Sequence, residues 1–279
     1  QICHGVAEHI ARYDGFARAL NEQGIVVAGH DHLGHGKSLP EGGTPVYFGE
    51  GNTWNTVVDD IYVLHQRLKQ RYPDVPLCIM GHSMGSFLTR TYLIRYPGTV
   101  KAAVIMGTGW QPRAAITGGL ALANAIAAVS GENATSELVT ELAFGSYNKL
   151  FAPNRTKVDW LSADESNVDD YIADPLCGAD ATVGLFRQML HGIRFNQRQS
   201  HLRQMDREMP VLFVAGDKDP VGNCGKGVRQ TYDAFRAAGM RDCTLKLYPG
   251  LRHEILNEKA YTADITKNIE AWLLSRLEK

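Results

Sequence analysis

The stretch Pro76–Gly85, which reads PLCIMGHSMG, most constrains the fold that this chain can adopt. Leu77–Met80 is a short apolar run, which is typical of a strand that is buried on both faces. Residues 86–96 predict a helix. Ser83 therefore lies on a sharp turn from a strand to a helix, where glycines on either side leave room for the neighbouring backbone.

Short apolar segments alternate with amphipathic segments around this turn, which predicts a mostly parallel α/β sheet with helices on both faces. The expected strands end at residue 3 and lie at 25–28, 77–80, 102–106, 211–215 and 245–248, and the expected helices of the core lie at 14–23, 54–72, 86–96 and 258–277. Between them, helix-like segments occur at 120–129, 136–144 and 181–194 without a convincing strand. We therefore predict a core of residues 1–107 and 208–279, with residues 108–207 inserted as a helical cap.

The composition of the chain excludes few functions, but it indicates which partners and which cellular compartment to expect. The net charge of −1 over 279 residues gives no electrostatic reason to expect nucleic acid or an anionic membrane as a partner. Five scattered cysteines without a C-x-x-C pair favour reduced thiols and a cytoplasmic location. The longest apolar candidate, Ala114–Val129, is interrupted, so we expect no membrane-spanning segment. Gln1–Cys3 reads as the end of a buried strand, so we expect N-terminal strands to be missing from this sequence. Oligomeric state and targeting signals are left open.

Nucleophilic catalysis by Ser83 requires a base, an acid that orients the base, and donors for an oxyanion. Asp217 and Asp219 both follow the expected strand 211–215, and we prefer Asp219 because it lies further into the loop. His253 follows the strand 245–248 and is the candidate base. The order of serine, acid and histidine is the one that this kind of turn requires.

Two backbone N–H groups are candidates for the oxyanion hole. Met84 begins the helix after Ser83, where free N–H groups favour negative charge. His4-Gly5 follows the first strand and turns the backbone so that the N–H of Val6 can join that of Met84. The alternative interpretation of His4-Gly5 is a simple turn.

Two other motifs favour a structural role. Gly36-Lys37-Ser38 resembles the end of a phosphate-binding loop, but that motif needs glycine at position 31, which is aspartate. His30, His32 and His35 suggest zinc, but no acidic residue lies at position 34. We expect neither a metal nor an organic cofactor.

The motifs together resemble the alpha/beta-hydrolase superfamily, and within it the monoacylglycerol lipase and lysophospholipase group, which is also filed with serine aminopeptidases of the S33 type. The resemblance rests on five motifs: HGxxEHxxRY at 4–13, DHxGHGxS at 31–38, GHSMG at 81–85, GxxD at 216–219 and HE at 253–254. It implies Ser83 as nucleophile, Asp219 as acid and His253 as base, with the N–H groups of Val6 and Met84 as oxyanion donors.

These observations predict a serine hydrolase for carboxylic esters with an apolar acyl chain. The apolar segment 120–129 is interpreted as lining an acyl chain or contacting a membrane surface transiently, and the alternative is a buried cap helix. Candidate pocket residues are His4, Gly5, His82, Trp110 and Leu120, while Trp110 and Trp160 fit a core role equally well. Two other functions stay open. A serine aminopeptidase would use carboxylates among Asp159, Asp164, Glu165, Asp169 and Asp170, and a non-catalytic binder would not use the triad at all.

Overall fold

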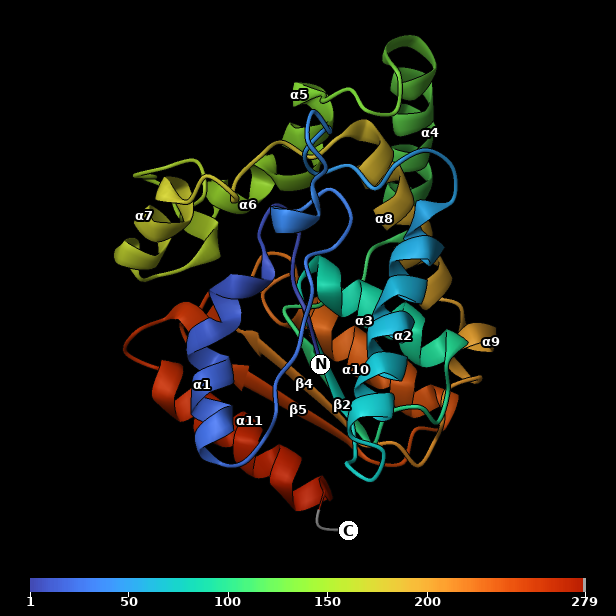
Figure 1. Ribbon diagram of the computed structural model, residues 1–279. Helices are drawn as coiled ribbons and strands as arrows, with labels where there is room; N and C mark the ends of the chain where they lie inside the picture. The colour runs from blue at the N-terminus through green and yellow to red at the C-terminus, as the bar shows by residue number, and fades with distance from the viewer. Residues whose placement is uncertain (278–279) are drawn as a thin grey trace.

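The computed structural model describes residues 1–277 and is built on a five-stranded parallel sheet (Figure 1). The strands are β1 (Ile2–Cys3), β2 (Cys78–His82), β3 (Ala102–Met106), β4 (Val211–Gly216) and β5 (Cys243–Tyr248), and they are adjacent in that order. His82 is paired with Met106 across β2 and β3. Because all strands run the same way, the loops after them lie along one edge of the sheet.

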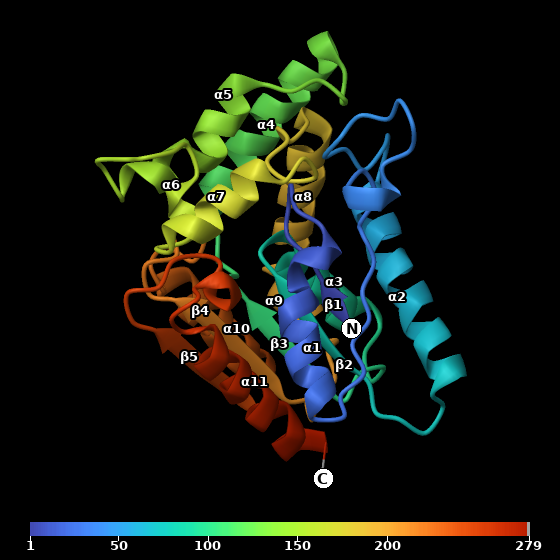
Figure 2. The same ribbon diagram turned by 60° about the vertical axis from the view of Figure 1, so that its left-hand side comes forward.

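Helices cover both faces of the sheet (Figures 1 and 2). One layer contains α2 (Thr53–Arg71), α3 (Met84–Arg95) and α10 (Lys226–Ala238), and the other contains α1 (Asp14–Glu22) and α11 (Thr262–Leu277). Successive strand residues point to opposite faces, so Ile105 packs with the first layer and Val104 with the second. The predicted parallel sheet with helices on both faces is therefore present.

Residues 108–207 contain α4 (Arg113–Ser130), α5 (Glu137–Thr140), α6 (Ser146–Lys149), α7 (Glu165–Ala173), α8 (Val183–Asn196) and α9 (Gln199–Leu202). This part of the described chain adds no strand to the five-stranded sheet. Figures 1 and 2 show α4 to α7 together on the side toward which the strands point. The segment therefore lies on the side of the loops that carry the predicted site.

Helix α4 corrects the expectation that no segment could span a membrane. Among residues 1–277 it is the one helix that is long and apolar enough to do so by length and composition, with a mean hydropathy of 1.3 over 18 residues. The polar interruptions are small and uncharged, so the helix continues through them. Only 17% of this window is buried, with Ile116, Leu120 and Ala123 packed inward and Val129 89% exposed. Because α4 packs along α8, length and composition alone do not make it a membrane span.

One other expectation was wrong, and one helix was not predicted. Residues 25–28 form no strand, because β1 has two residues and pairs with this segment through one isolated bridge between Ile2 and Gly29. The acidic run after Asp164 forms the helix α7, which was not predicted. The Asp164 carboxylate accepts the Ser166 N–H at 3.0 Å and so begins the helix.

Candidate active site

Ser83 lies between β2 and α3 in a strained backbone conformation. Its φ of 55° and ψ of −123° are of the kind that costs a non-glycine residue on the order of 1–3 kcal/mol. The turn is fixed because the Ser83 N–H donates to the Met106 carbonyl at 3.0 Å. A Cβ at Gly81 would lie 2.2 Å from the Gly85 carbonyl oxygen, and one at Gly85 would lie 2.1 Å from the Cys3 oxygen. The close packing therefore requires both glycines.

The loops after β4 and β5 bring Asp219 and His253 together. His253 Nδ1 lies 3.0 Å from Asp219 Oδ1, and the two side chains are 2% and 0% exposed. The same carboxylate oxygen accepts the N–H of Val221 at 2.9 Å, which fixes its orientation. Asp217 instead accepts the N–H of Gly250 at 2.8 Å. The preferred acid, and not its alternative, is therefore the partner of His253.

The His253 ring lies against the turn that carries Ser83. Its centroid is 4.6 Å from that of His82, whose Nε2 lies 3.2 Å from the His253 carbonyl oxygen. With Nδ1 facing Asp219, His253 Nε2 is the ring nitrogen that is left for a reacting group. Within residues 1–277 the Ser83 hydroxyl makes no hydrogen bond, so the contact between the predicted nucleophile and the predicted base is not formed here. Such contacts are often long before substrate binds.

The loop after β1 lies over the start of α3. A Cβ at Gly5 would lie 3.1 Å from Ser83 Cβ, which shows how closely this loop approaches the serine. The Gly5 N–H donates to Glu8 Oε1 at 2.5 Å. The N–H groups of Val6 and Met84 have no acceptor among the described residues, and both belong to segments that meet at Ser83. Both are therefore free to donate to a bound group.

The other candidate pocket residues divide into three groups. His4 is fully buried, donates from Nδ1 to the Gly5 oxygen at 2.7 Å and accepts the His32 N–H, so it supports the loop from below. His82 is buried among polar groups, and Leu120 packs inward from α4. The Trp110 ring has no close ring contact with His253, whose aromatic neighbours are His82 and Trp160.

An aromatic cluster from residues 108–207 covers His253. Trp160 lies 5.1 Å from the His253 ring and is itself packed against Phe144 and Tyr147. Burial, together with the nearby Asp219 charge, raises the pKa of Tyr147 to about 12. Sequence reasoning did not assign Phe144 or Tyr147 to the site, because no motif connects them to His253. Their shared aromatic character was the available signal.

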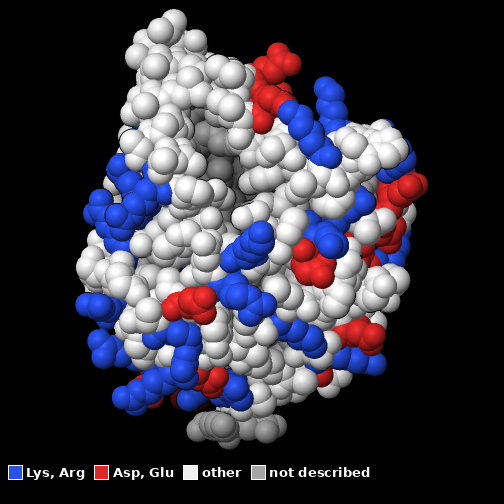
Figure 3. All heavy atoms as spheres, turned by 180° about the vertical axis from the view of Figure 1, so that it is seen from behind, with Lys and Arg blue, Asp and Glu red and all other residues white. Residues whose placement is uncertain are grey.

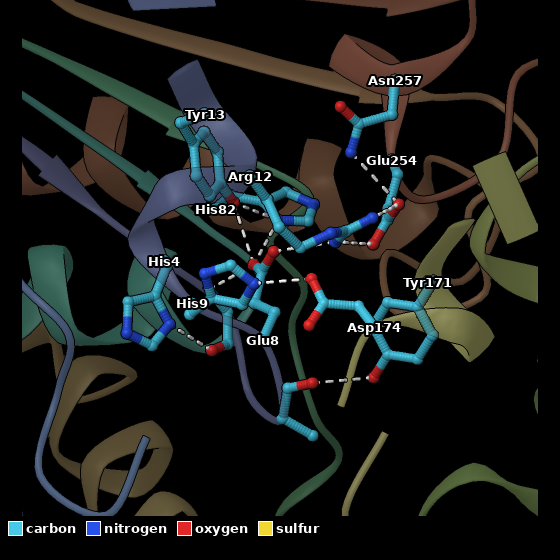
Figure 4. Close-up of polar contacts among 12 residues, drawn as sticks. His4, Glu8, His9, Arg12, Tyr13, His82, Tyr171, Asp174, Glu254 and Asn257 are labelled. Carbon is cyan, nitrogen blue, oxygen red and sulfur yellow. Dashed lines mark hydrogen bonds and ion pairs between the residues drawn. The ribbon is translucent and has the colours of Figure 1, made fainter. Parts of the chain in front are cut away.

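A buried polar network connects the loop after β1, the serine turn and the His253 loop (Figure 4). Figure 4 shows the Arg12 guanidinium between two carboxylates, at 2.9 Å from Glu8 Oε2 and at 2.6 and 2.8 Å from the two oxygens of Glu254. The hydroxyl of Tyr13 donates to Glu8 Oε1 at 2.9 Å. The network therefore fixes three loops of the candidate site to one another. Glu8, Arg12 and Glu254 were quoted only as motif letters in the sequence, without a role.

The charges in this network compensate one another. Burial acts to raise the pKa of Glu8, but the hydrogen bond to His82 and the charge of Arg12 outweigh it and hold that pKa well below its usual range. Burial acts to lower the pKa of His82, but Glu8 raises it above the ordinary value. Arg12 likewise outweighs burial and lowers the pKa of Glu254. The Arg12 guanidinium therefore lies between two buried carboxylates, and one of them also faces His82.

Metal ligands do not converge on the histidines that the sequence singled out. In the described part of the chain, the group whose ligand atoms all lie within 4.8 Å of one another is His9, Asp174 and Cys177. His9 Nε2 and Asp174 Oδ2 are already 2.8 Å apart in an ordinary contact between α7 and the first loop. His30, His32 and His35 do not form such a group.

Comparison with known proteins identifies the family to which this chain belongs. Residues 1–260 match the family described as serine aminopeptidase, S33. The chain is 31% identical to the monoacylglycerol lipase of Mycolicibacterium smegmatis over 281 residues, which cover 99% of this chain and 88% of that protein. It is 28% identical to the monoglyceride lipase of Mus musculus over 283 residues, with 99% and 82% covered.

A solved structure agrees with this result. The carboxyl esterase from Bacillus coagulans, crystallised in complex with glycerol, superposes with a TM-score of 0.92 at 26% identity. The match covers 99% of this chain and 89% of that chain. The expected fold, a parallel sheet with helices on both faces and a group of helices over one edge, is therefore shared with esterases.

Proposed function

Because the chain belongs to the serine aminopeptidase S33 family of α/β hydrolases and resembles its lipases and esterases, we propose that it cleaves carboxylic esters with one apolar acyl chain. The substrate class is a monoacylglycerol or a lysophospholipid. The observation that carries the proposal is the buried contact of 3.0 Å between His253 and Asp219, beside the strained turn at Ser83.

In the first half of the reaction, Ser83 Oγ attacks the ester carbonyl carbon while its proton passes to His253 Nε2. Asp219 holds the ring through Nδ1 and stabilises the imidazolium that forms. The N–H groups of Val6 and Met84 donate to the oxyanion, and loss of one such donor typically costs about 10²–10³ in kcat. When the tetrahedral intermediate collapses, the His253 Nε2 proton passes to the leaving alkoxide, and the alcohol departs.

In the second half, His253 Nε2 takes a proton from water as the water oxygen attacks the acyl-enzyme. The tetrahedral intermediate then expels Ser83 Oγ, which recovers its proton from His253, and the carboxylic acid is released. The Trp160 ring beside His253 shields the contact between His253 and Asp219 from bulk solvent, which strengthens that contact. The protein needs neither a metal nor an organic cofactor for these steps.

The apolar surface beside the site favours a greasy acyl chain. The exposed side of α4 is almost entirely uncharged, and Phe144 and Trp160 place aromatic rings above His253. A transient contact of α4 with a lipid surface in the cytoplasm is part of the same proposal, because monoacylglycerols are held in such surfaces.

An aminopeptidase function receives less support from the side chains. The cap carboxylates that would hold a substrate ammonium group already have partners within the protein. Asp159 accepts the N–H groups of Arg155 and Thr156, Asp169 pairs with Arg155 at 2.6 Å, and Asp164 begins α7. We therefore favour ester hydrolysis on this triad.

A fluorophosphonate probe tests the nucleophile. We expect one covalent adduct on the wild-type protein, measured by intact mass spectrometry, and none on Ser83→Ala. Ser86→Ala is the matched control, because Ser86 lies in α3 and donates to the Ser83 carbonyl at 2.6 Å. A wild-type protein that stays unlabelled would favour a non-catalytic binder.

The substrate class is tested with p-nitrophenyl esters of increasing acyl length, compared with amino-acid p-nitroanilides. We expect kcat/KM to rise from acetate to medium-chain esters, with little turnover of anilides. Turnover of anilides without turnover of esters would replace the lipase proposal with the aminopeptidase.

A further inference from the structure

A cavity lies between the start of α2 and the later part of α8, and none of its lining residues belongs to the proposed hydrolytic site. Its volume is about 500 Å³, which is within the roughly 300–1,000 Å³ of small-molecule sites. The charged and polar side chains that line it include Asn52, Asn55, Arg187, His191, Arg194 and Arg198. Figure 3, which is turned by 180° from Figure 1, shows Lys and Arg side chains along the left-hand edge of the molecule, and this edge corresponds to the right-hand side of Figure 1, where α8 and α9 lie.

The positive charge of this cavity is mostly uncompensated. Arg187 Nη2 pairs with Glu132 Oε1 at 2.5 Å. Arg194 and Arg198 have no carboxylate within ion-pair distance anywhere in residues 1–277. One of the three guanidinium groups therefore has a carboxylate partner, and no acidic residue lines the cavity.

The hydrogen bond of His191 is consistent with this excess of positive charge. Its Nδ1 lies 3.0 Å from Arg194 Nη2, and because arginine can only donate, this nitrogen must accept and the ring is neutral. Burial lowers the pKa of His191, and the charges of Arg194 and Arg187 lower it further. A neutral histidine between two arginines leaves its other ring nitrogen available to an incoming group.

The start of α2 adds to the positive potential. This helix has 19 residues, no acidic residue in its first turn and no side-chain cap from Asn52. The Trp54 N–H has one long contact, at 3.5 Å, with Gln188 Oε1. The positive end of the helix dipole therefore faces a cavity that arginines line from the other side.

We propose that this cavity binds an anion that carries a phosphate group, either a free phosphate ester or the headgroup of an anionic phospholipid. Guanidinium groups match phosphate oxygens in a two-pronged geometry, and helix starts favour the same ligand. The cavity opens beside α4, from which Asn124 also contributes to the lining, so both sources can reach it. The site is separate from the ester hydrolysis proposed above and does not depend on it.

Glycerol 3-phosphate binding, measured by isothermal titration calorimetry at 20 and 150 mM salt, tests the free ligand. Sedimentation with phosphatidylcholine vesicles, with and without phosphatidylglycerol, tests the headgroup. The test variant is Arg194→Gln/Arg198→Gln. The control is Arg229→Gln/Lys267→Gln, which removes the same charge from exposed positions on α10 and α11. Thermal unfolding and p-nitrophenyl ester turnover show whether each variant is folded.

We expect the test variant to lose at least tenfold in affinity while the control and the ester turnover stay unchanged. Saturable binding of glycerol 3-phosphate identifies a free phosphate ester as the source, and binding only to vesicles with phosphatidylglycerol identifies the headgroup. Absence of both, or an equal loss in the control variant, overturns the proposal. If Arg194→Gln/Arg198→Gln does not fold, the single variant Arg198→Gln with the single control Arg229→Gln decides the same question.

Discussion

Two groups of buried histidines differ in the charges that surround them. His82 and His253 each contact a carboxylate, from Glu8 and Asp219 respectively. The rings of His4 and His32 lie with their centroids 4.2 Å apart, and neither side chain has a carboxylate in contact. The same side chain therefore has two different roles in one protein.

The difference is visible in the pKa values of His82, His4 and His32. Glu8 raises the pKa of His82 despite its burial. Burial and neighbouring histidines lower the pKa of His4 to about 4 and that of His32 well below its ordinary value. A buried histidine beside a carboxylate can carry or exchange a proton, whereas one packed among other histidines is a neutral support.

Removal of the Asp219 charge is the most direct test of the difference between the two groups of histidines. We expect Asp219→Asn to lower kcat by about 10⁴, because the His253 ring loses the group that fixes its tautomer and orientation. Asp217→Asn is the control, since its carboxylate contacts the Gly250 N–H and not the histidine. Steady-state ester hydrolysis measures both, and a larger loss in Asp217→Asn would reverse the assignment.

Glu8→Gln tests the charge balance beside His82. The change leaves Arg12 and His82 with Glu254 as their one remaining anion, so we expect a loss of about 3–5 kcal/mol in the free energy of unfolding, together with a lower kcat. Urea unfolding measures the first quantity. Glu22→Gln, at an exposed position on α1, should change neither. An unchanged stability of Glu8→Gln would show that the network is not held by charge.

The neutral state of His4 is tested by the dependence of stability on pH. The His4 pKa of about 4 in the folded protein lies below the unfolded value of about 6.5, so the unfolded state binds more protons between these values. Stability is therefore complete above pH 6.5 and falls as the pH approaches 4, by about 3 kcal/mol from His4. We expect His4→Asn to be less stable at pH 7.5 but to lose less on acidification. Urea unfolding at pH 7.5, 6 and 5 measures this, and a slope equal to that of wild type contradicts it.

The smallest expected effect is that of Gly107→Ala, which tests whether the position of the His253 ring limits the rate. Gly107 has a φ of 58°, and a Cβ there would lie 3.0 Å from His253 Cε1 and 3.1 Å from His82 Cδ2. Gly98 has a φ of 74° with nothing within 4 Å. Both alanine variants should lose about 1–2 kcal/mol from backbone strain. Only Gly107→Ala should also lower kcat, by about tenfold, because it displaces the His253 ring. Equal rates in the two variants would show that the ring position is not limiting.

Prediction from the sequence succeeded where a local pattern carries the information. The strand, turn and helix around Ser83 follow from an apolar run, two glycines and a helical period, which act over neighbouring residues. Prediction failed for residues 25–28, because a strand forms only where a neighbouring strand pairs with it. It also failed for α7, because the acidic residues of this helix are mostly exposed and carry no clear apolar pattern. It left Trp160 undecided between core and pocket and did not consider Tyr147, because the contact of Trp160 with His253 joins residues about ninety positions apart and Tyr147 contacts Trp160 in turn.

The sequence by itself determined the family and the parallel sheet, because these are recorded in short motifs and in periodicity, and the same motifs predict the order of serine, acid and histidine along the chain. Only the tertiary structure decided that Asp219 and not Asp217 contacts His253, and that Arg12 joins Glu8 to Glu254. The reason is physical. Both choices depend on which loops meet at the carboxyl edge of the sheet, and on distances of a few ångströms between side chains that are far apart in the chain.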